Sequence, residues 1–397
     1  MNSNVFFQDY MADVLNSPYG EFPLGFMIAV NKILEKISEI VELKRKFATA
    51  KLAESIFKAL NVSKKNPFNE ANFHYVQFQN SARSTILMIE LFNLSSLFIS
   101  EFSFQLVFVK SKIDELIKYH LYSPAVVLQT SVCSFITSCA NHKSLCEKFI
   151  EDGILQILLD DINNSRCSMC SAGIKNILDH DLSVKFAISG RLEVCDKIES
   201  GFYATKRDWV GFMNLREIMR KDVVNPFYPI YSINFEKKAE EKRKSKEEHN
   251  LMNRKIRYDQ DLMNLIESFC NDEDFVIIDY VEKIKSVAQK VSKHLQTQDD
   301  CISHQLEVNL NELKFKFQSS VLPIGSLVYG KSFEAALLFK SLADQLNIDS
   351  TFVTDKSTGK AWNEVCHKVN IVDLFSNPGD LYERRSIQAR VYLNNIA

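Results

Sequence analysis

The stretch from Gly325 to Ser332 matches a pattern whose residue types can bind phosphate. Gly325, Gly330, Lys331 and Ser332 spell GxxxxGKS, in which backbone amides and the lysine hold phosphates and the hydroxyl contacts Mg²⁺. Such a loop follows a hydrophobic strand and opens a helix. Here Pro323 interrupts the strand candidate, and the loop interior SLVY is bulky where a phosphate cradle needs small residues. A nucleotide-binding module is therefore kept as an alternative function.

Cys167 and Cys170 form a CxxC pair, a spacing that occurs in zinc and redox sites. Zinc needs a second pair of ligands at suitable spacing, and a redox pair needs a βαβ surrounding. Both cysteines continue an apolar helical pattern with Ile174 and Ile177, so small buried side chains that pack helix on helix explain them. We expect no metal site and no cofactor. Nine cysteines in a long chain without a basic N-terminal leader further predict reduced thiols.

The composition favours helices joined by short loops. The chain has 397 residues, of which 46% are hydrophobic and 25% charged, with only 11 glycines and 8 prolines. So few turn residues disfavour an all-β sandwich or barrel. The net charge of −2 lacks the basic footprint of a nucleic-acid binder, and no stretch of about 18 apolar residues predicts a membrane span. We expect protein partners, with no nucleic acid, membrane insertion or small-molecule substrate.

Residues 82–215 show a repeated helical pattern, whereas residues 1–81 are expected to hold degenerate helices. Gly153 separates two apolar helical patterns, as a glycine does when it ends one helix before the next begins. Similar boundaries at Lys112 and Gly190 lie 41 and 37 residues away. These spacings are close to the period of armadillo and HEAT-type repeats.

A charged stretch separates the repeats from a second domain. Residues 236–250 carry six basic and five acidic residues without an apolar stripe, which predicts a charged linker over 236–258. Within the domain expected at 259–397, Phe275–Leu295 reads as one long helix. Short β-rich pieces then surround a helix expected at Glu334–Leu346, which is α+β texture.

Residues 323–381 resemble the peptidase-like domain shared by armadillo repeat-containing protein 3 and the plant disease-resistance and ethylene-response kinases. The matching pieces are Pro323-Ile324-Gly325, Ala336-Leu337-Leu338-Phe339-Lys340, Leu342-Ala343-Asp344, Ala361-Trp362-Asn363-Glu364-Val365, Val372-Asp373-Leu374 and Asn377-Pro378-Gly379-Asp380-Leu381. The preceding repeats resemble armadillo repeats, so residues 82–397 together resemble the armadillo repeat-containing protein 3 family. The resemblance implies a multi-domain fold: an α-solenoid of armadillo-like repeats followed by an α+β domain of the transglutaminase/papain-like superfamily.

The same resemblance places three catalytic positions. In the transglutaminase-like fold a Cys at a helix start, a His before a strand and an Asp on the next strand act together, and these positions fall on Ser332, Lys360 and Asp373. A serine without a neighbouring base is a poor nucleophile, and a lysine in a polar loop stays protonated. His367 follows seven residues after Lys360, too late to serve as base. The resemblance therefore implies a pseudoenzyme, with a residual Ser/Lys hydrolase or transferase as an alternative.

In armadillo superhelices an Asn of the third helix binds the backbone of an extended peptide, and the resemblance places Asn93, Thr137 and Asn176 there. The alternative is that Asn176 merely bonds a neighbouring loop. Taken together, we expect a non-catalytic protein–protein interaction scaffold. The reduced thiols expected above predict a cytoplasmic protein, and the family resemblance implies a cilium or flagellum as its site.

Overall fold

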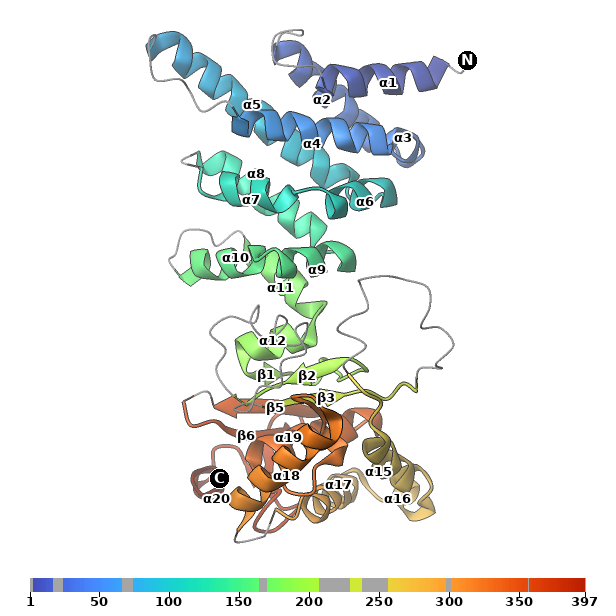
Figure 1. The fold of residues 1–397 in the computed structure, drawn as a ribbon, viewed down its shortest axis with the longest axis vertical. Coiled ribbons are helices and arrows are strands. Elements are labelled where there is room, and N and C mark those ends of the chain that lie inside the picture. The colour runs from blue at the N-terminus through green and yellow to red at the C-terminus, as the bar shows by residue number, and fades with distance from the viewer. Residues whose placement is uncertain are drawn as a thin grey trace. The chain divides into compact units, whose positions relative to one another are not determined.

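The computed structural model describes residues 3–16, 24–65, 74–123, 125–163, 170–206, 229–237, 256–297, 301–355 and 357–396. The chain divides into two compact units, Met1–Asp181 and Leu182–Ala397. The first is helical, and the second combines helices with two separate sheets (Figure 1). No helix in the described ranges is long and apolar enough to cross a bilayer.

The first unit is a succession of helices in groups of three. Two helices come first, α1 (Ser3–Asn16) and α2 (Leu24–Ser38). Three groups then follow: α3 (Val41–Phe47), α4 (Ala50–Lys65) and α5 (His74–Phe98); α6 (Phe102–Lys110), α7 (Ile113–Leu121) and α8 (Val126–Cys139); and α9 (Lys143–Glu151), α10 (Ile154–Asn163) and α11 (Ser171–Asp179). Corresponding helices contact one another from group to group: α1, α4, α7 and α10 form one row, and α2, α5, α8 and α11 form another (Figure 1).

Two of the three expected helix boundaries occur where the sequence placed them. Lys112 lies between α6 and α7, and Gly153 lies between α9 and α10 with a φ of +75°, a left-handed conformation that favours glycine. The third differs. Gly190 follows α12 (Leu182–Ser189) and precedes a strand, so it marks the change from helix to sheet instead of another repeat.

Buried aromatic rings hold the rows of the first unit together. Phe92 and Phe108 each pack on Phe135 of α8, at ring-centroid distances of 5.7 and 5.5 Å, and all three rings are fully buried. Each ring removed from water contributes about 1.5–3 kcal/mol. The apolar positions that recur along α5, α6 and α8 therefore fix how one group packs on the next.

A disulfide joins two neighbouring groups. Cys133 of α8 is bonded to Cys170, which directly precedes α11, and both are buried. The prediction of reduced thiols is therefore wrong for this pair in the structure. Helices α8 and α11 also approach closely: a Cβ added at Gly173 of α11 would stand 3.0 Å from Oγ1 of Thr137 of α8. Cys167, the other half of the CxxC, lies outside the described residues.

The second unit contains a five-stranded antiparallel sheet and a smaller three-stranded sheet. The first has the order β1 (Arg191–Leu192), β5 (Ser350–Asp355), β6 (Lys360–Val365), β7 (Asn370–Val372) and β8 (Leu381–Glu383). The second has the order β2 (Phe202–Ala204), β3 (Ile230–Ile233) and β4 (Val321–Pro323), in which β3 and β4 run parallel. A short 3₁₀ helix, Ile324–Ser326, follows β4.

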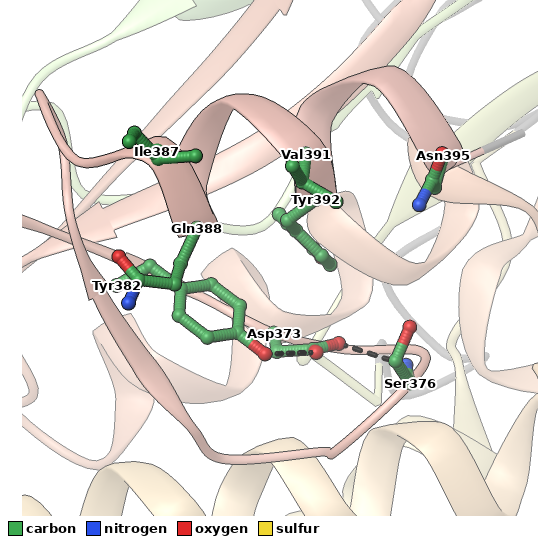
Figure 2. Close-up of a pocket in the computed structure, with 8 residues that line it drawn as sticks. All are labelled: Asp373, Ser376, Tyr382, Ile387, Gln388, Val391, Tyr392 and Asn395. Atoms are coloured by element: carbon green, nitrogen blue, oxygen red, sulfur yellow. Dashed lines mark hydrogen bonds between the residues drawn. The ribbon is translucent and has the colours of Figure 1, made fainter.

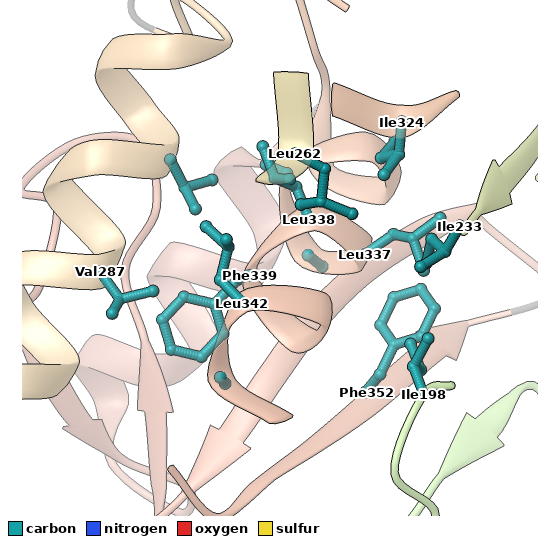
Figure 3. Close-up of a cluster of buried hydrophobic side chains, with 14 of the residues drawn as sticks. Ile198, Ile233, Leu262, Val287, Ile324, Leu337, Leu338, Phe339, Leu342 and Phe352 are labelled. Atoms are coloured by element: carbon teal, nitrogen blue, oxygen red, sulfur yellow. The ribbon is translucent and has the colours of Figure 1, made fainter. Parts of the chain in front are cut away.

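Helices surround these sheets, and one of them is central. The outer helices are α15 (Gln260–Cys270), α16 (Glu273–Ile277), α17 (Tyr280–His294), α18 (Ile302–Phe317) and α20 (Ile387–Asn395). The central helix, α19 (Ser332–Gln345), is buried from Ser332 to Asp344 and contacts β5, β6, α15 and α17. Its apolar side chains meet those of both sheets and the outer helices in one core (Figure 3).

The division of the chain differs from the one expected. The second unit begins at Leu182, whereas the sequence placed the end of the repeats at 215 and the start of the next domain at 259. The reason is strand pairing over long sequence distances: Arg191 pairs with Val353, and Ile230 pairs with Val321. Most of the expected linker, residues 238–255, lies outside the described residues.

Two expected elements of the second domain also differ. The single helix expected at Phe275–Leu295 is two helices, α16 and α17, because Asp272 and Asp279 each cap a new helix start. The piece SLVY, expected to be β-rich, forms no strand, since Ile324–Ser326 is 3₁₀ helix and irregular chain follows.

Candidate functional site

Ser332, the position that the family resemblance assigns to the nucleophile, is the first residue of α19. Ser332 is 0% exposed, and its Oγ accepts a hydrogen bond of 3.4 Å from the backbone N–H of Ala361. The structure thus brings the start of α19 beside strand β6. The hydroxyl is enclosed by the core, however, and a substrate carbonyl could not reach it without local opening of the unit.

Lys360, the position of the base, begins β6. Successive side chains of a strand point to opposite faces. Ala361 lies beside Ser332, and Asn363 donates to the backbone carbonyl of Ala336, so this face of β6 packs on α19. The Lys360 ammonium instead donates to the carbonyls of Leu393 and Asn394, at 3.0 and 2.6 Å.

This placement gives Lys360 a structural partner. Unpaired carbonyls at a helix C-terminus carry partial negative charge, and a lysine there satisfies them. Lys360 therefore ties the end of α20 to the sheet, on the face turned away from Ser332. The structure does not bring the two groups together as a Ser–Lys pair.

Asp373, the third position, organises a tight turn after β7. Its buried carboxylate accepts the backbone N–H groups of Phe375, Ser376 and Asn377 at 2.7, 2.9 and 3.1 Å, and the hydroxyl of Tyr382 at 2.9 Å. Burial and the neighbouring carboxylate raise the pKa of Tyr382 to about 12. Four donors occupy this carboxylate, so it orients no base. His367 is exposed in the turn after β6, at the end of the strand opposite Lys360.

A pocket of about 580 Å³ opens between this turn, β8 and α20 (Figure 2). It is lined by Asp373, Ser376, Tyr382, Ile387, Gln388, Val391, Tyr392 and Asn395. The sequence-based reasoning found Asp373 but missed α20. The sequence signal for the start of α20 was Ser386, an N-cap residue whose side chain accepts a hydrogen bond from the backbone N–H of Ala389.

Most backbone amides of the GxxxxGKS loop are already bonded within the protein. The N–H of Gly325 donates to the carboxylate of Asp259 at 2.8 Å, and that of Gly330 donates to the carbonyl of Leu295 at 3.0 Å. The N–H of Lys331 donates to the carboxylate of Glu334 at 3.0 Å. Three of the amides that would bind a phosphate are thus bonded within the protein, two of them to carboxylates that repel an anion.

A Cβ at Gly325 would also overlap the backbone of Leu262. This glycine is therefore required for close packing of the loop on α15, a role that differs from approach to a phosphate.

The three armadillo-type positions lie on α5, α8 and α11, which contact one another in the row described above. Asn93 is exposed. Thr137 bonds the carbonyl of Cys133 in its own helix at 2.9 Å. The Asn176 amide donates to Oδ1 of Asn141 at 3.2 Å, so it bonds a neighbouring loop, the alternative noted for it.

No group of three or more His, Cys, Asp and Glu side chains in the described part of the chain is arranged to hold a metal ion. Cys139 and Cys146 are both buried, and burial raises the pKa of each thiol. Neither thiol is therefore ready to act as a ligand or nucleophile at neutral pH.

Comparison with known proteins places the second unit within one family. The sequence model of the EDR1/CTR1/ARMC3 peptidase-like family matches residues 179–382. Armadillo repeat-containing protein 3 from Homo sapiens is 36% identical over 101 residues, which cover 22% of this chain and 12% of the human protein. The matched segment is thus a small part of that relative. No solved structure matches the chain.

Proposed function

Because the chain belongs to the EDR1/CTR1/ARMC3 peptidase-like family, we propose that it is a protein-interaction scaffold whose peptidase-like unit performs no catalysis. One observation carries this proposal. The three positions of the family's chemistry each have a structural use: Ser332 is enclosed, Lys360 caps α20 and Asp373 holds a turn. Each group contributes to folding, and the three share no common cavity.

The first unit supplies the binding element in this proposal. Its rows of corresponding helices support an armadillo-like α-solenoid, an architecture that uses an extended face to bind other proteins. The row α2, α5, α8 and α11 carries the exposed Asn93, with the exposed apolar side chains of Ile86 and Leu97 on the same helix. An exposed amide between exposed apolar side chains suits an extended peptide segment of a partner protein.

The second unit supports a transglutaminase/papain-like arrangement in outline. A helix that begins at the nucleophile position packs against antiparallel strands, and its first residue bonds the strand that carries the base position. The alternative of a Ser/Lys hydrolase or transferase would need Lys360 to leave α20 and cross to the other face of β6. The nucleotide-binding alternative would need the amides of Gly325, Gly330 and Lys331 to exchange their present acceptors for phosphate.

The binding proposal is tested by blocking the row. Asn93→Arg places a long charged side chain at an exposed position of α5. Glu54→Arg makes a similar change at an exposed position of α4, which belongs to the other row. Affinity purification of the full chain and both variants, with quantitative mass spectrometry, should show partners that Asn93→Arg loses and Glu54→Arg keeps. Equal recovery from all three proteins would contradict a binding role for this row.

The proposed site in the cell rests on the family resemblance. We propose a cytoplasmic protein that is associated with a cilium or flagellum. Imaging of the tagged full chain in ciliated cells tests this. Staining of the cell body that leaves the axoneme unlabelled would contradict it.

A further inference from the structure

The corner between α16 and α17 exposes an unusual set of apolar side chains. Val276, Ile277, Tyr280 and Val281 are all exposed, and Ile277 is 82% exposed. The corner is nonetheless held in place, since Phe275 is buried and its ring packs on Phe269 with centroids 4.8 Å apart. Large apolar side chains held together in water mark an interaction surface.

Carboxylates surround these side chains. Residues 272–282, called here the acidic corner, hold five acidic residues and no basic one: Asp272, Glu273, Asp274, Asp279 and Glu282. Two lysines just beyond these residues offset part of the charge: Lys285 approaches Glu282 at 3.9 Å, and the Lys283 ammonium lies 5.8 Å from the centroid of the Phe275 ring. The remaining carboxylates give the corner a net negative charge, and its partner must be basic as well as apolar.

A surface of the opposite character lies on α20. Ile387 and Val391 are exposed on one side of this helix, at 77% and 53%, and both line the 580 Å³ pocket (Figure 2). Residues 384–395 comprise the turn after β8 and α20 and are called here the basic helix face. They contain three arginines and no carboxylate: Arg384 and Arg385 in the turn and Arg390 on the helix. All three arginines are exposed, but Arg384 also pairs with the carboxylate of Glu364 at 3.2 Å, so Arg385 and Arg390 supply most of the positive charge. A volume of about 580 Å³ is large enough for the pocket to take an aliphatic side chain.

The two surfaces lie at opposite sides of the second unit, so they cannot meet within one chain (Figure 1). A second copy of the chain offers the acidic corner to the basic helix face without this restriction. We infer that copies of this chain associate head to tail, with Ile277 of one copy entering the pocket beside Ile387 and Val391 of the next. A contact between two different surfaces leaves one of each free, so it builds rings or filaments.

This inference goes beyond the proposed scaffold function and does not depend on it. Sedimentation velocity of the full chain from about 1 to about 100 μM should show a rising sedimentation coefficient, and association should weaken between about 50 and 500 mM salt. Nonreducing denaturing gels exclude intermolecular disulfides. A coefficient that stays at the monomer value over this range would overturn the inference.

Two substitutions locate the contact. Ile277→Lys should raise the apparent dissociation constant at least about tenfold, because it places a charge at the centre of the contact. Val308→Lys is the matched control, since Val308 is an exposed apolar residue on α18 of the same unit. Association that both variants retain equally would place the contact elsewhere and overturn the inference.

A charge-reversal mixture guards against misfolding of a single variant. Glu273→Lys, Asp274→Lys and Glu282→Lys together make the corner basic, because only Asp272 and Asp279 then remain acidic in it, and Arg385→Glu with Arg390→Glu makes the helix face acidic. Each reversed protein alone should remain monomeric, because its two surfaces now carry the same sign. Mixed together they should associate again. A mixture that stays monomeric while the wild type associates would overturn the inference.

Discussion

Lys340 of α19 offers the sharpest test of how the second unit is held together. It is 0% exposed, and its ammonium donates to Oδ1 of Asp344 at 2.7 Å and to the carbonyl of Ser350 at 2.9 Å. The other oxygen of Asp344 accepts the N–H of Ile198 at 2.8 Å. One buried ion pair thus joins the central helix to β5 and to the segment before β2.

Lys340→Met should lower the free energy of unfolding of this unit by about 3–5 kcal/mol at neutral pH. Methionine keeps most of the apolar length of the side chain, so the loss comes chiefly from the carboxylate left without its partner. Burial raises the pKa of Asp344 to about 6 even with Lys340 beside it, against an ordinary value of 3.8. A folded-state pKa above the unfolded one means that stability falls as pH rises through this window.

The substitution therefore has a predicted pH dependence. Lys340 lowers the pKa of Asp344, so its loss moves this pKa higher, and acidification from about pH 7.5 to about pH 5.5 should shrink the deficit. Trp362 lies on β6 of the second unit, so urea unfolding followed by tryptophan fluorescence reports on this unit.

Lys368→Met is the matched control for this experiment. Lys368 also pairs with a carboxylate, that of Glu193 at 2.5 Å, but it is 41% exposed. Its loss should cost less than about 1 kcal/mol. Equal effects of the two substitutions, or a Lys340→Met deficit that does not shrink at low pH, would refute this reasoning.

Three further predictions concern other contacts. Tyr231→Phe removes a 2.6 Å hydrogen bond to buried Glu334 and should cost about 2 kcal/mol in urea unfolding of the second unit; a cost near zero would mean that water replaces the hydroxyl. Gly325→Ala should destabilise the same unit by about 3 kcal/mol, because its Cβ overlaps the backbone of α15; wild-type stability would contradict the close packing. Alkylation of the protein unfolded in urea, read by mass spectrometry, should leave Cys133 and Cys170 unmodified until reductant is added, and modification without reductant would contradict the disulfide.

Local patterns in the sequence predicted several of the helices and two of the three expected helix junctions. The boundaries at Lys112 and Gly153 follow from apolar spacing and from a glycine that can adopt a positive φ, and both are properties of neighbouring residues. The helix expected at Glu334–Leu346 is present as Ser332–Gln345 for the same reason. The break between α16 and α17 was missed, although Asp272 and Asp279 are the N-cap residues that cause it.

The extent of the second unit could not be predicted in this way. Strand β1 has two residues and pairs with β5, and β3 pairs with β4, so each strand is defined by a partner far along the chain. Such pairing leaves almost no local periodicity.

The geometry of the candidate site had the same limit. The family resemblance supplied Ser332, Lys360 and Asp373, but only strand alternation in the folded sheet places Lys360 on the face turned away from Ser332.

A fluorophosphonate probe tests the absence of catalysis most directly, because it reacts covalently with an activated serine hydroxyl. The full chain is incubated with the probe beside the Ser332→Ala and Lys360→Ala variants, and labelling is measured by intact-mass spectrometry. An enclosed Ser332 without a base predicts no labelling above that of Ser332→Ala. Labelling that maps to Ser332 and is lost in both variants would show an active Ser–Lys pair and contradict the proposed function.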